Sequence, residues 1–194
     1  LYLDSGIAFV DQSLRGYHGS EGDDNVFEDD GWSENQDGVD TVAWIRSQPW
    51  SNDIVGTLGG SALAMSTILL ASAEPTIQGQ VLILGADKIY DLHAYQGGVF
   101  KKHFIETWVS QLGSDHLIER YKAHPGDDVY WAKLDSRSRV DRVTTPGFHI
   151  GGWWDIYAQG TLDTFMSRQY KGGIGALGNQ KLLMGPWHHL PIKN

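Results

Sequence analysis

Residues 54–73 read IVGTLGGSALAMSTILLASA, and this stretch decides the fold that we expect for the chain. Residues 54–58 form an apolar run that is typical of a buried strand. Residues 59–61 are Gly-Gly-Ser, which favours a tight turn, and the Ala- and Leu-rich residues 62–73 favour a helix. The stretch therefore predicts a strand that turns sharply and leads straight into a helix.

On both sides of this unit, short apolar runs alternate with amphipathic segments. Further strands are predicted at residues 7–10, 81–84, 147–150 and 181–184, and further helices at residues 37–48, 100–112 and 157–168. This alternation indicates an α/β fold with a mostly parallel sheet flanked by helices. We assign residues 1–194 to one domain and expect the less regular residues 88–134 to form a short helical cap inserted into it.

The composition narrows the range of partners. A net charge of −9 makes nucleic acid and anionic membranes poor partners, and no apolar run has the length of a membrane span. The absence of cysteine excludes disulfides, thiolate metal sites and a cysteine nucleophile. The histidines show no zinc-binding spacing, so neither a metal nor another cofactor is predicted.

An acidic segment lies early in the chain, with six carboxylates between residues 21 and 30. Their spacing does not match that of a calcium-binding loop. Residues 15–35 are polar and rich in glycine, which predicts a loop. We expect the carboxylates of this loop to be solvated.

Side chains with complementary chemistry follow three of the predicted strands. They are Ser61, Asp155 and the pair His188-His189. In a parallel sheet, the carboxyl ends of the strands bring functional groups to one edge. A serine hydroxyl is a weak nucleophile that needs a base and a carboxylate to orient that base. The chain therefore carries the parts of a Ser-His-Asp triad, in the Ser, Asp, His order of an α/β-hydrolase.

The turn at Ser61 also offers an oxyanion donor. A helix that follows the nucleophile directs its N-terminal N–H groups at the reacting oxygen, so the backbone N–H of Ala62 is the expected donor. The elbow motif is usually written G-x-S-x-G, and Leu63 replaces its last glycine. The local motif is weak by itself, and the order of the three residues carries the prediction. The alternatives are a plain strand-to-helix turn for Ser61 and a helix N-cap for Asp155.

Five segments resemble the family of serine hydrolases that contains cocaine esterase, the X-Pro dipeptidyl-peptidases and the α-amino acid ester hydrolases. They extend over nearly the whole chain and are QSLRGYHGSEG (12–22), DGVDTVAWIRSQPWSNDIVG (37–56), YQGG (95–98), PGFHIGGWWDIYAQG (146–160) and LMGPWHH (183–189). The second of these matches is quite specific. The resemblance implies a nucleophile at Ser61, an acid at Asp155, a base at His189 with His188 as its neighbour, and no cofactor.

The chain also departs from this family. Ala62 stands where many members have Tyr, and no residue here matches the upstream Tyr that usually supplies a second oxyanion donor. Members usually carry a β-sandwich after the catalytic histidine. We therefore expect a partial catalytic domain that lacks the first strands and the C-terminal β-sandwich. We also expect the chain alone to be weakly active or partly unfolded.

The expected substrates are small carboxylic esters, with short peptides as the alternative. Trp154 and Tyr157 indicate an apolar or aromatic acyl pocket. Residues 156–158 carry none of the carboxylates that hold a substrate ammonium in the α-amino acid ester hydrolases, and Asp91 is the candidate for a single charge. X-Pro dipeptidyl-peptidase activity, amide or acylase activity, and a non-catalytic binding module are the alternatives to an esterase.

Overall fold

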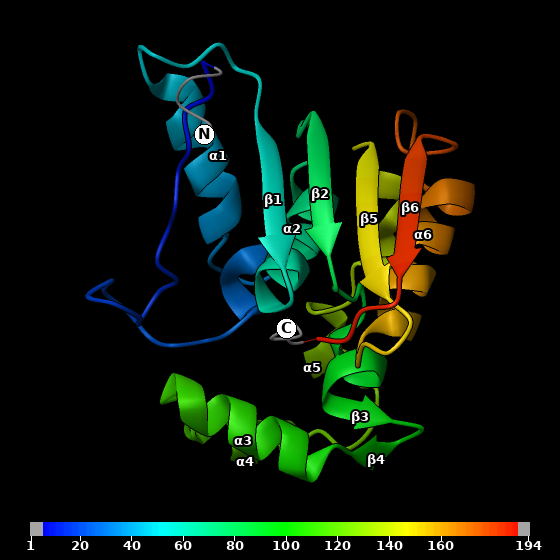
Figure 1. Cartoon of the computed structure of the whole chain (residues 1–194). Coiled ribbons are helices and arrows are strands. Elements are labelled where there is room, and N and C mark those ends of the chain that lie inside the picture. Colours follow the sequence, from blue (N-terminus) through cyan, green and yellow to red (C-terminus); the bar gives the residue numbers. More distant parts are fainter. Residues whose placement is uncertain (1–5, 190–194) are drawn as a thin grey trace.

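The computed structural model describes residues 6–189 and is built around a four-stranded parallel sheet (Figure 1). Its strands are β1 (Gly56–Gly60), β2 (Gly79–Ile83), β5 (Gly147–Gly152) and β6 (Gln180–Gly185), and they lie side by side in this order. Each strand connects to the next through helical segments, as parallel neighbours require. The strands predicted around residues 54, 81, 147 and 181 are thus confirmed, and no end moves by more than two residues.

Helices cover one face of this sheet (Figure 1). The helix α2 (Ala62–Ala73) packs on β1 and β2, and α6 (Ala158–Lys171) packs on β5 and β6. The side chains of Met65 and Leu69 on α2 are buried, which fits a helix with so little polar surface. The helix α1 (Asp37–Ser47) packs against α2. This is the α/β fold that the alternating pattern predicts.

Most of the chain between β2 and β5 lies beyond the carboxyl ends of the strands (Figure 1). It contains the π-helix η3 (Tyr90–Ala94), β3 (Tyr95–Gln96), β4 (Val99–Phe100), α3 (Lys102–Leu112), α4 (His116–Lys122), α5 (Val129–Ala132) and the 3-10 segment η4 (Arg137–Arg142). β3 and β4 form an antiparallel hairpin. Buried aromatic side chains from this region belong to the same hydrophobic cluster as Met65 and Leu69 of α2. We call this region the cap, and it faces the edge of the sheet where Ser61 lies.

Residues 7–10 do not form the strand predicted for them. They have no regular structure, and the side chains of Ile7 and Phe9 are exposed. The segment runs beside α1 rather than β1 (Figure 1), and the neighbouring Gln12 accepts a hydrogen bond from Thr41 of α1. A short apolar run becomes a strand only when another strand takes up its backbone hydrogen bonds, and among the described residues no strand pairs with it.

The acidic segment is not solvated throughout, contrary to its prediction. Its second half forms the 3-10 helix η2 (Glu28–Asp30), whose three carboxylates are buried. Glu28 accepts hydrogen bonds from Arg120 of α4 and Tyr130 of α5, and it pairs with Lys133. These partners lie far away in the sequence, so the composition of the segment alone cannot reveal them.

The other face of the sheet carries exposed apolar side chains. In register, Leu58 of β1 pairs with Val81 and Val81 pairs with Phe148, so the three share one face. Leu58 and Phe148 are exposed there, whereas the alternate residue Leu82 is buried under the helices. Among residues 6–189, no helix is long and apolar enough to cross a membrane.

Candidate active site

Ser61 lies at the turn between β1 and α2 in a backbone conformation that few residues adopt. Its φ is 56° and its ψ is −122°, and strain of this kind in a residue other than glycine is concentrated at functional sites. The Ser61 N–H donates to the Ile83 carbonyl of β2 at 2.8 Å. A Cβ on Gly59 would collide with the Leu63 carbonyl, so the turn requires glycine there. The Leu63 side chain is 62% exposed, which explains how it is tolerated in place of the usual glycine.

The structure brings Ser61, His189 and Asp155 into one line of hydrogen bonds. The Ser61 Oγ and the His189 Nε2 are 2.8 Å apart, and the His189 Nδ1 and the Asp155 Oδ2 are 2.8 Å apart. The Tyr157 N–H donates to the other carboxylate oxygen of Asp155 at 2.6 Å. The Asp155 side chain is fully buried and that of His189 is partly exposed, so the line runs from the interior towards the surface.

Backbone hydrogen bonds join the loops after β5 and β6, and this places Asp155 beside His189. The Trp154 N–H donates to the Trp187 carbonyl at 3.0 Å. A Cβ on Gly152 would collide with the same carbonyl, so glycine permits the close approach of the two loops. Asp155 and His189 therefore owe their positions to neighbouring strands, although 34 residues separate them along the chain.

The hydrogen bonds of the site have a defined direction. A carboxylate only accepts hydrogen bonds, so the His189 Nδ1 carries the proton and the Nε2 is left to accept the Ser61 hydroxyl proton. Ala62 begins α2, and its N–H has no acceptor within the helix. That N–H and the positive end of the helix dipole both favour negative charge beside Ser61. The site can therefore activate a hydroxyl and stabilise an oxyanion.

Tyr157 is buried directly beside His189. The two rings meet edge-on with 5.3 Å between their centroids, and the Tyr157 hydroxyl bonds the His93 Nδ1 at 2.6 Å. Burial lowers the pKa of His93 to about 3, so this imidazole is neutral. Phe104 and Trp108 of α3 pack edge-on against the His93 ring. We call Tyr157, His93, Phe104 and Trp108 the aromatic wall.

Trp154 and Asp91, the other two predicted pocket residues, do not belong to the aromatic wall. Trp154 is 75% exposed on the loop that leads to Asp155. Asp91 lies on η3, and its carboxylate forms an ion pair with Lys88 at 3.0 Å. The roles of Trp154 and Asp91 in substrate binding stay predictions.

Sequence reasoning did not find the members of the aromatic wall that come from the cap. The amphipathic pattern of residues 100–112 predicts a helix there, which α3 confirms, but it does not indicate what Phe104 and Trp108 contact. His93 is consistent with a structural histidine, as a lone histidine usually is. Its contact with Tyr157 depends on the fold of the cap, for which no short sequence signal exists.

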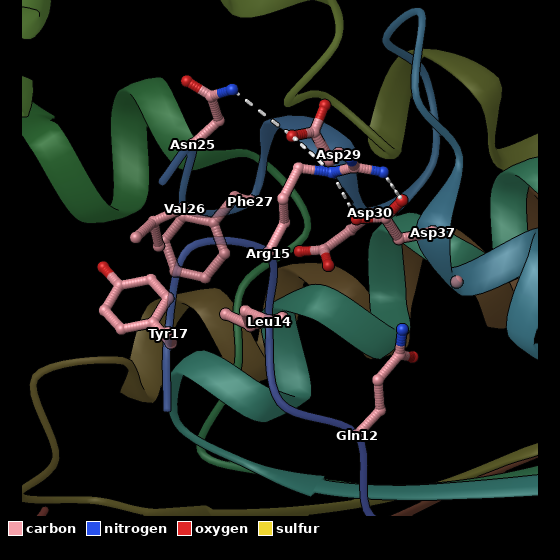
Figure 2. Close-up of a pocket in the computed structure, with 11 residues that line it drawn as sticks. Gln12, Leu14, Arg15, Tyr17, Asn25, Val26, Phe27, Asp29, Asp30 and Asp37 are labelled. Carbon is pink, nitrogen blue, oxygen red and sulfur yellow. Dashed lines mark hydrogen bonds and ion pairs between the residues drawn. The ribbon is translucent and has the colours of Figure 1, made fainter. Parts of the chain in front are cut away.

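A cavity of about 40 Å³ lies between the N-terminal segment and η2, apart from the triad residues (Figure 2). Arg15 donates hydrogen bonds to Asp37 on its lining, and the Asp30 Oδ2 has no hydrogen-bond partner among the described residues. Burial raises the pKa of Asp30 to about 6, and the charges of Asp29 and Asp37 add to this effect. In residues 6–189, no group of three or more His, Asp or Glu side chains is arranged to hold a metal ion.

One family model and several curated proteins are similar in sequence to this chain. The family model described as X-Pro dipeptidyl-peptidase (S15 family) matches residues 1–117 and 110–191. A Mycobacterium tuberculosis protein whose name places it among the serine esterases is 34% identical over 136 residues, which are 69% of this chain and 20% of that protein. The cocaine esterase of Rhodococcus sp. (strain MB1 Bresler) is 22% identical over 236 residues, with 97% of this chain and 39% of the esterase covered.

Solved structures show the same fold. A CocE/NonD family hydrolase from Staphylococcus aureus matches with a TM-score of 0.73 and 23% identity, over 90% of this chain and 31% of that chain. An α-amino acid ester hydrolase matches with a TM-score of 0.56 and 19% identity, over 91% of this chain and 36% of that chain. The expected α/β-hydrolase fold is thus confirmed. The chain spans between a fifth and two fifths of the length of the curated relatives it matches.

Proposed function

Because the chain belongs to the X-Pro dipeptidyl-peptidase (S15) family, we propose that it is a serine hydrolase that cleaves carboxylic esters by acyl transfer to water. The observation that carries the proposal is the line of hydrogen bonds from the Ser61 Oγ through His189 to the buried Asp155. Two relatives whose names describe them as esterases support the same reaction.

Catalysis proceeds through an acyl-enzyme. His189 takes the Ser61 proton as the Oγ attacks the ester carbonyl, and the Ala62 N–H stabilises the resulting oxyanion. His189 then protonates the leaving alcohol, which leaves the acyl group bound to Ser61. Water, deprotonated by His189, attacks this acyl group and releases the acid. Asp155 keeps the imidazole in the required tautomer and stabilises its charged form in both steps.

The substrate class follows from the surroundings of His189. The aromatic wall adjoins the base through the buried Tyr157, and its partly exposed members Phe104 and Trp108 suit contact with an apolar or aromatic acyl group. An X-Pro dipeptidyl-peptidase must instead hold the N-terminal ammonium of its substrate, and a desolvated ammonium needs a carboxylate partner. Asp91 is the predicted candidate for that role, but its carboxylate is already paired with Lys88. Ester hydrolysis is therefore favoured over peptidase activity.

The test combines hydrolysis of p-nitrophenyl butyrate with labelling by a fluorophosphonate probe. We expect Ser61→Ala to abolish both, because the probe and the ester react with the same Oγ. Ser47→Ala is the matched control, since Ser47 is an exposed serine on α1, and it should retain both. Labelling that persists in Ser61→Ala would contradict the proposal. An unaltered protein that neither reacts with the probe nor cleaves esters would favour a non-catalytic binding module.

A second pair of variants tests the choice of base. His189→Ala should lower kcat by roughly 10³-fold or more, since it removes the proton acceptor. His188→Ala should leave kcat nearly unchanged, because His188 is exposed. A loss confined to His188→Ala would mean that the base is assigned one residue too late in the chain.

A further inference from the structure

We propose that Lys101 binds an anionic group at the far end of the substrate's acyl chain, so that the preferred substrates are monoesters of dicarboxylic acids. This inference rests on the proposed ester hydrolysis and names a substrate class within it. Lys101 precedes α3, and its N–H donates to the Ala94 carbonyl at 2.9 Å. The cap therefore fixes the Lys101 backbone next to the hairpin of β3 and β4.

Lys101 is a cation without a carboxylate partner in the part of the chain that the structure describes. Its Nζ lies 3.5 Å from the Leu92 carbonyl, which is the limit of a hydrogen bond. Other basic side chains do form ion pairs, namely Arg15, Arg46, Lys88, Arg120, Lys122, Lys133 and Arg137. A partly buried ammonium with one long hydrogen bond is only partly compensated for the hydration that it loses. A bound carboxylate would restore both the hydrogen bonds and the opposite charge.

The Tyr157 ring lies between Lys101 and His189 of the candidate triad. The Lys101 Nζ lies 6.0 Å from the centroid of the Tyr157 ring and 5.0 Å from that of Phe104. The Tyr157 ring in turn meets the His189 ring at 5.3 Å. Tyr157 itself is buried, but Phe104 is partly exposed and adjoins both Tyr157 and Lys101. In this proposal, an acyl chain that extends from Ser61 passes the Phe104 ring and ends near the Lys101 ammonium. Phe104 and Trp108, the partly exposed members of the aromatic wall, contact the apolar part of such a chain, and Lys101 contacts its charged end.

Lys101 supplies the positive charge beside the aromatic wall. His93 is neutral because burial depresses its pKa, so it does not share this role. Burial also lowers the pKa of Lys101, and a carboxylate beside the ammonium would oppose that effect.

The test compares three phenyl esters that differ in where they carry charge. Phenyl valerate is neutral, phenyl hydrogen glutarate carries a carboxylate on the acyl side, and 4-carboxyphenyl valerate carries one on the leaving group. In Lys101→Met, the ratio of kcat/KM for the glutarate ester to that for the valerate ester should fall roughly 10- to 100-fold. Lys102→Met removes the same charge from the adjacent, exposed lysine, and the ratio should not change.

Salt and binding provide two further readouts. Sodium chloride at 0.5 M should reduce the preference of the unaltered protein for the glutarate ester, since it screens the charge on Lys101. Calorimetry with phenyl hydrogen glutarate on the Ser61→Ala background measures binding without turnover. Adding Lys101→Met to that background should abolish the measured binding, whereas adding Lys102→Met should preserve it.

Three results would overturn the inference. Equal losses for the neutral and the glutarate esters in Lys101→Met would assign the residue a structural role only. A change confined to 4-carboxyphenyl valerate would place the anion on the leaving-group side. Binding of phenyl hydrogen glutarate that does not depend on Lys101 would exclude the contact. If the unaltered protein cleaves none of the three esters, the proposed ester hydrolysis fails instead, and the calorimetry still decides about Lys101.

Discussion

Replacing Asp30 with asparagine should stabilise the protein at neutral pH but not at acidic pH. Asp30 lies on η2 beside the cavity of Figure 2, and its Oδ2 has no hydrogen-bond partner within residues 6–189. Burial, aided by the charges of Asp29 and Asp37, raises its pKa from 3.8 to about 6. The carboxyl group therefore ionises less readily in the folded protein than in the unfolded chain.

The size of the effect follows from the linkage between pKa and stability. Each unit of pKa difference corresponds to about 1.4 kcal/mol, so the difference between 3.8 and about 6 lowers the free energy of unfolding by about 3 kcal/mol once Asp30 is ionised. Because the folded pKa is the higher one, this stability is present below pH 3.8 and is lost as the pH rises through 6. Asn has nearly the same shape and no charge, so Asp30→Asn should gain about 2–3 kcal/mol at pH 8.

Urea unfolding followed by tryptophan fluorescence measures this difference at pH 4 and at pH 8. Asp53→Asn is the matched control, because Asp53 is exposed and its φ of 66° is one that Asn also adopts. We expect the control to change stability by less than about 0.5 kcal/mol at either pH. A loss of stability in Asp30→Asn at pH 8, or a gain of equal size at both pH values, would mean that the ionised Asp30 does not destabilise the fold.

Three other substitutions test the elbow, the buried acidic cluster and the triad. Gly59→Ala should abolish fluorophosphonate labelling, because a Cβ there collides with the Leu63 carbonyl; normal labelling would contradict the strained turn. Glu28→Gln should lower the free energy of unfolding in urea by about 2 kcal/mol, because it removes the carboxylate that pairs with Arg120; unchanged stability would mean that the pair is not structural. Asp155→Asn should lower kcat by about 10⁴-fold, because the wrong tautomer of the base is favoured; a kcat close to that of the unaltered protein would exclude the assigned acid.

The central part of the fold could be predicted from local patterns. The helix predicted at residues 62–73 is α2 with the same bounds, because its composition and its buried environment favour the same structure. The candidate residues Ser61, Asp155 and His189 could be found because strand ends determine their positions. The turn at Ser61 also imposes residue types that are visible in the sequence, such as Gly59.

The rest depends on contacts between distant segments. Residues 7–10 have the composition of a strand but no neighbouring strand among the described residues. The composition of a segment does not show whether another strand lies beside it. Glu28 is buried because Arg120 and Lys133 meet it from the cap, whereas its neighbours in the sequence are typical of a loop. The contact between Lys101 and Tyr157 likewise exists only after the cap has folded over the sheet.

In the proposed mechanism, Ser61 carries the acyl group during ester hydrolysis. Rapid mixing with p-nitrophenyl butyrate, acid quenching within milliseconds and mass spectrometry of the protein and its peptides would detect that intermediate directly. We expect a butyryl adduct on the peptide that contains Ser61, its absence in Ser61→Ala, and much slower formation in His189→Ala. Turnover without an adduct on Ser61, or an adduct on a different residue, would show that Ser61 is not the nucleophile.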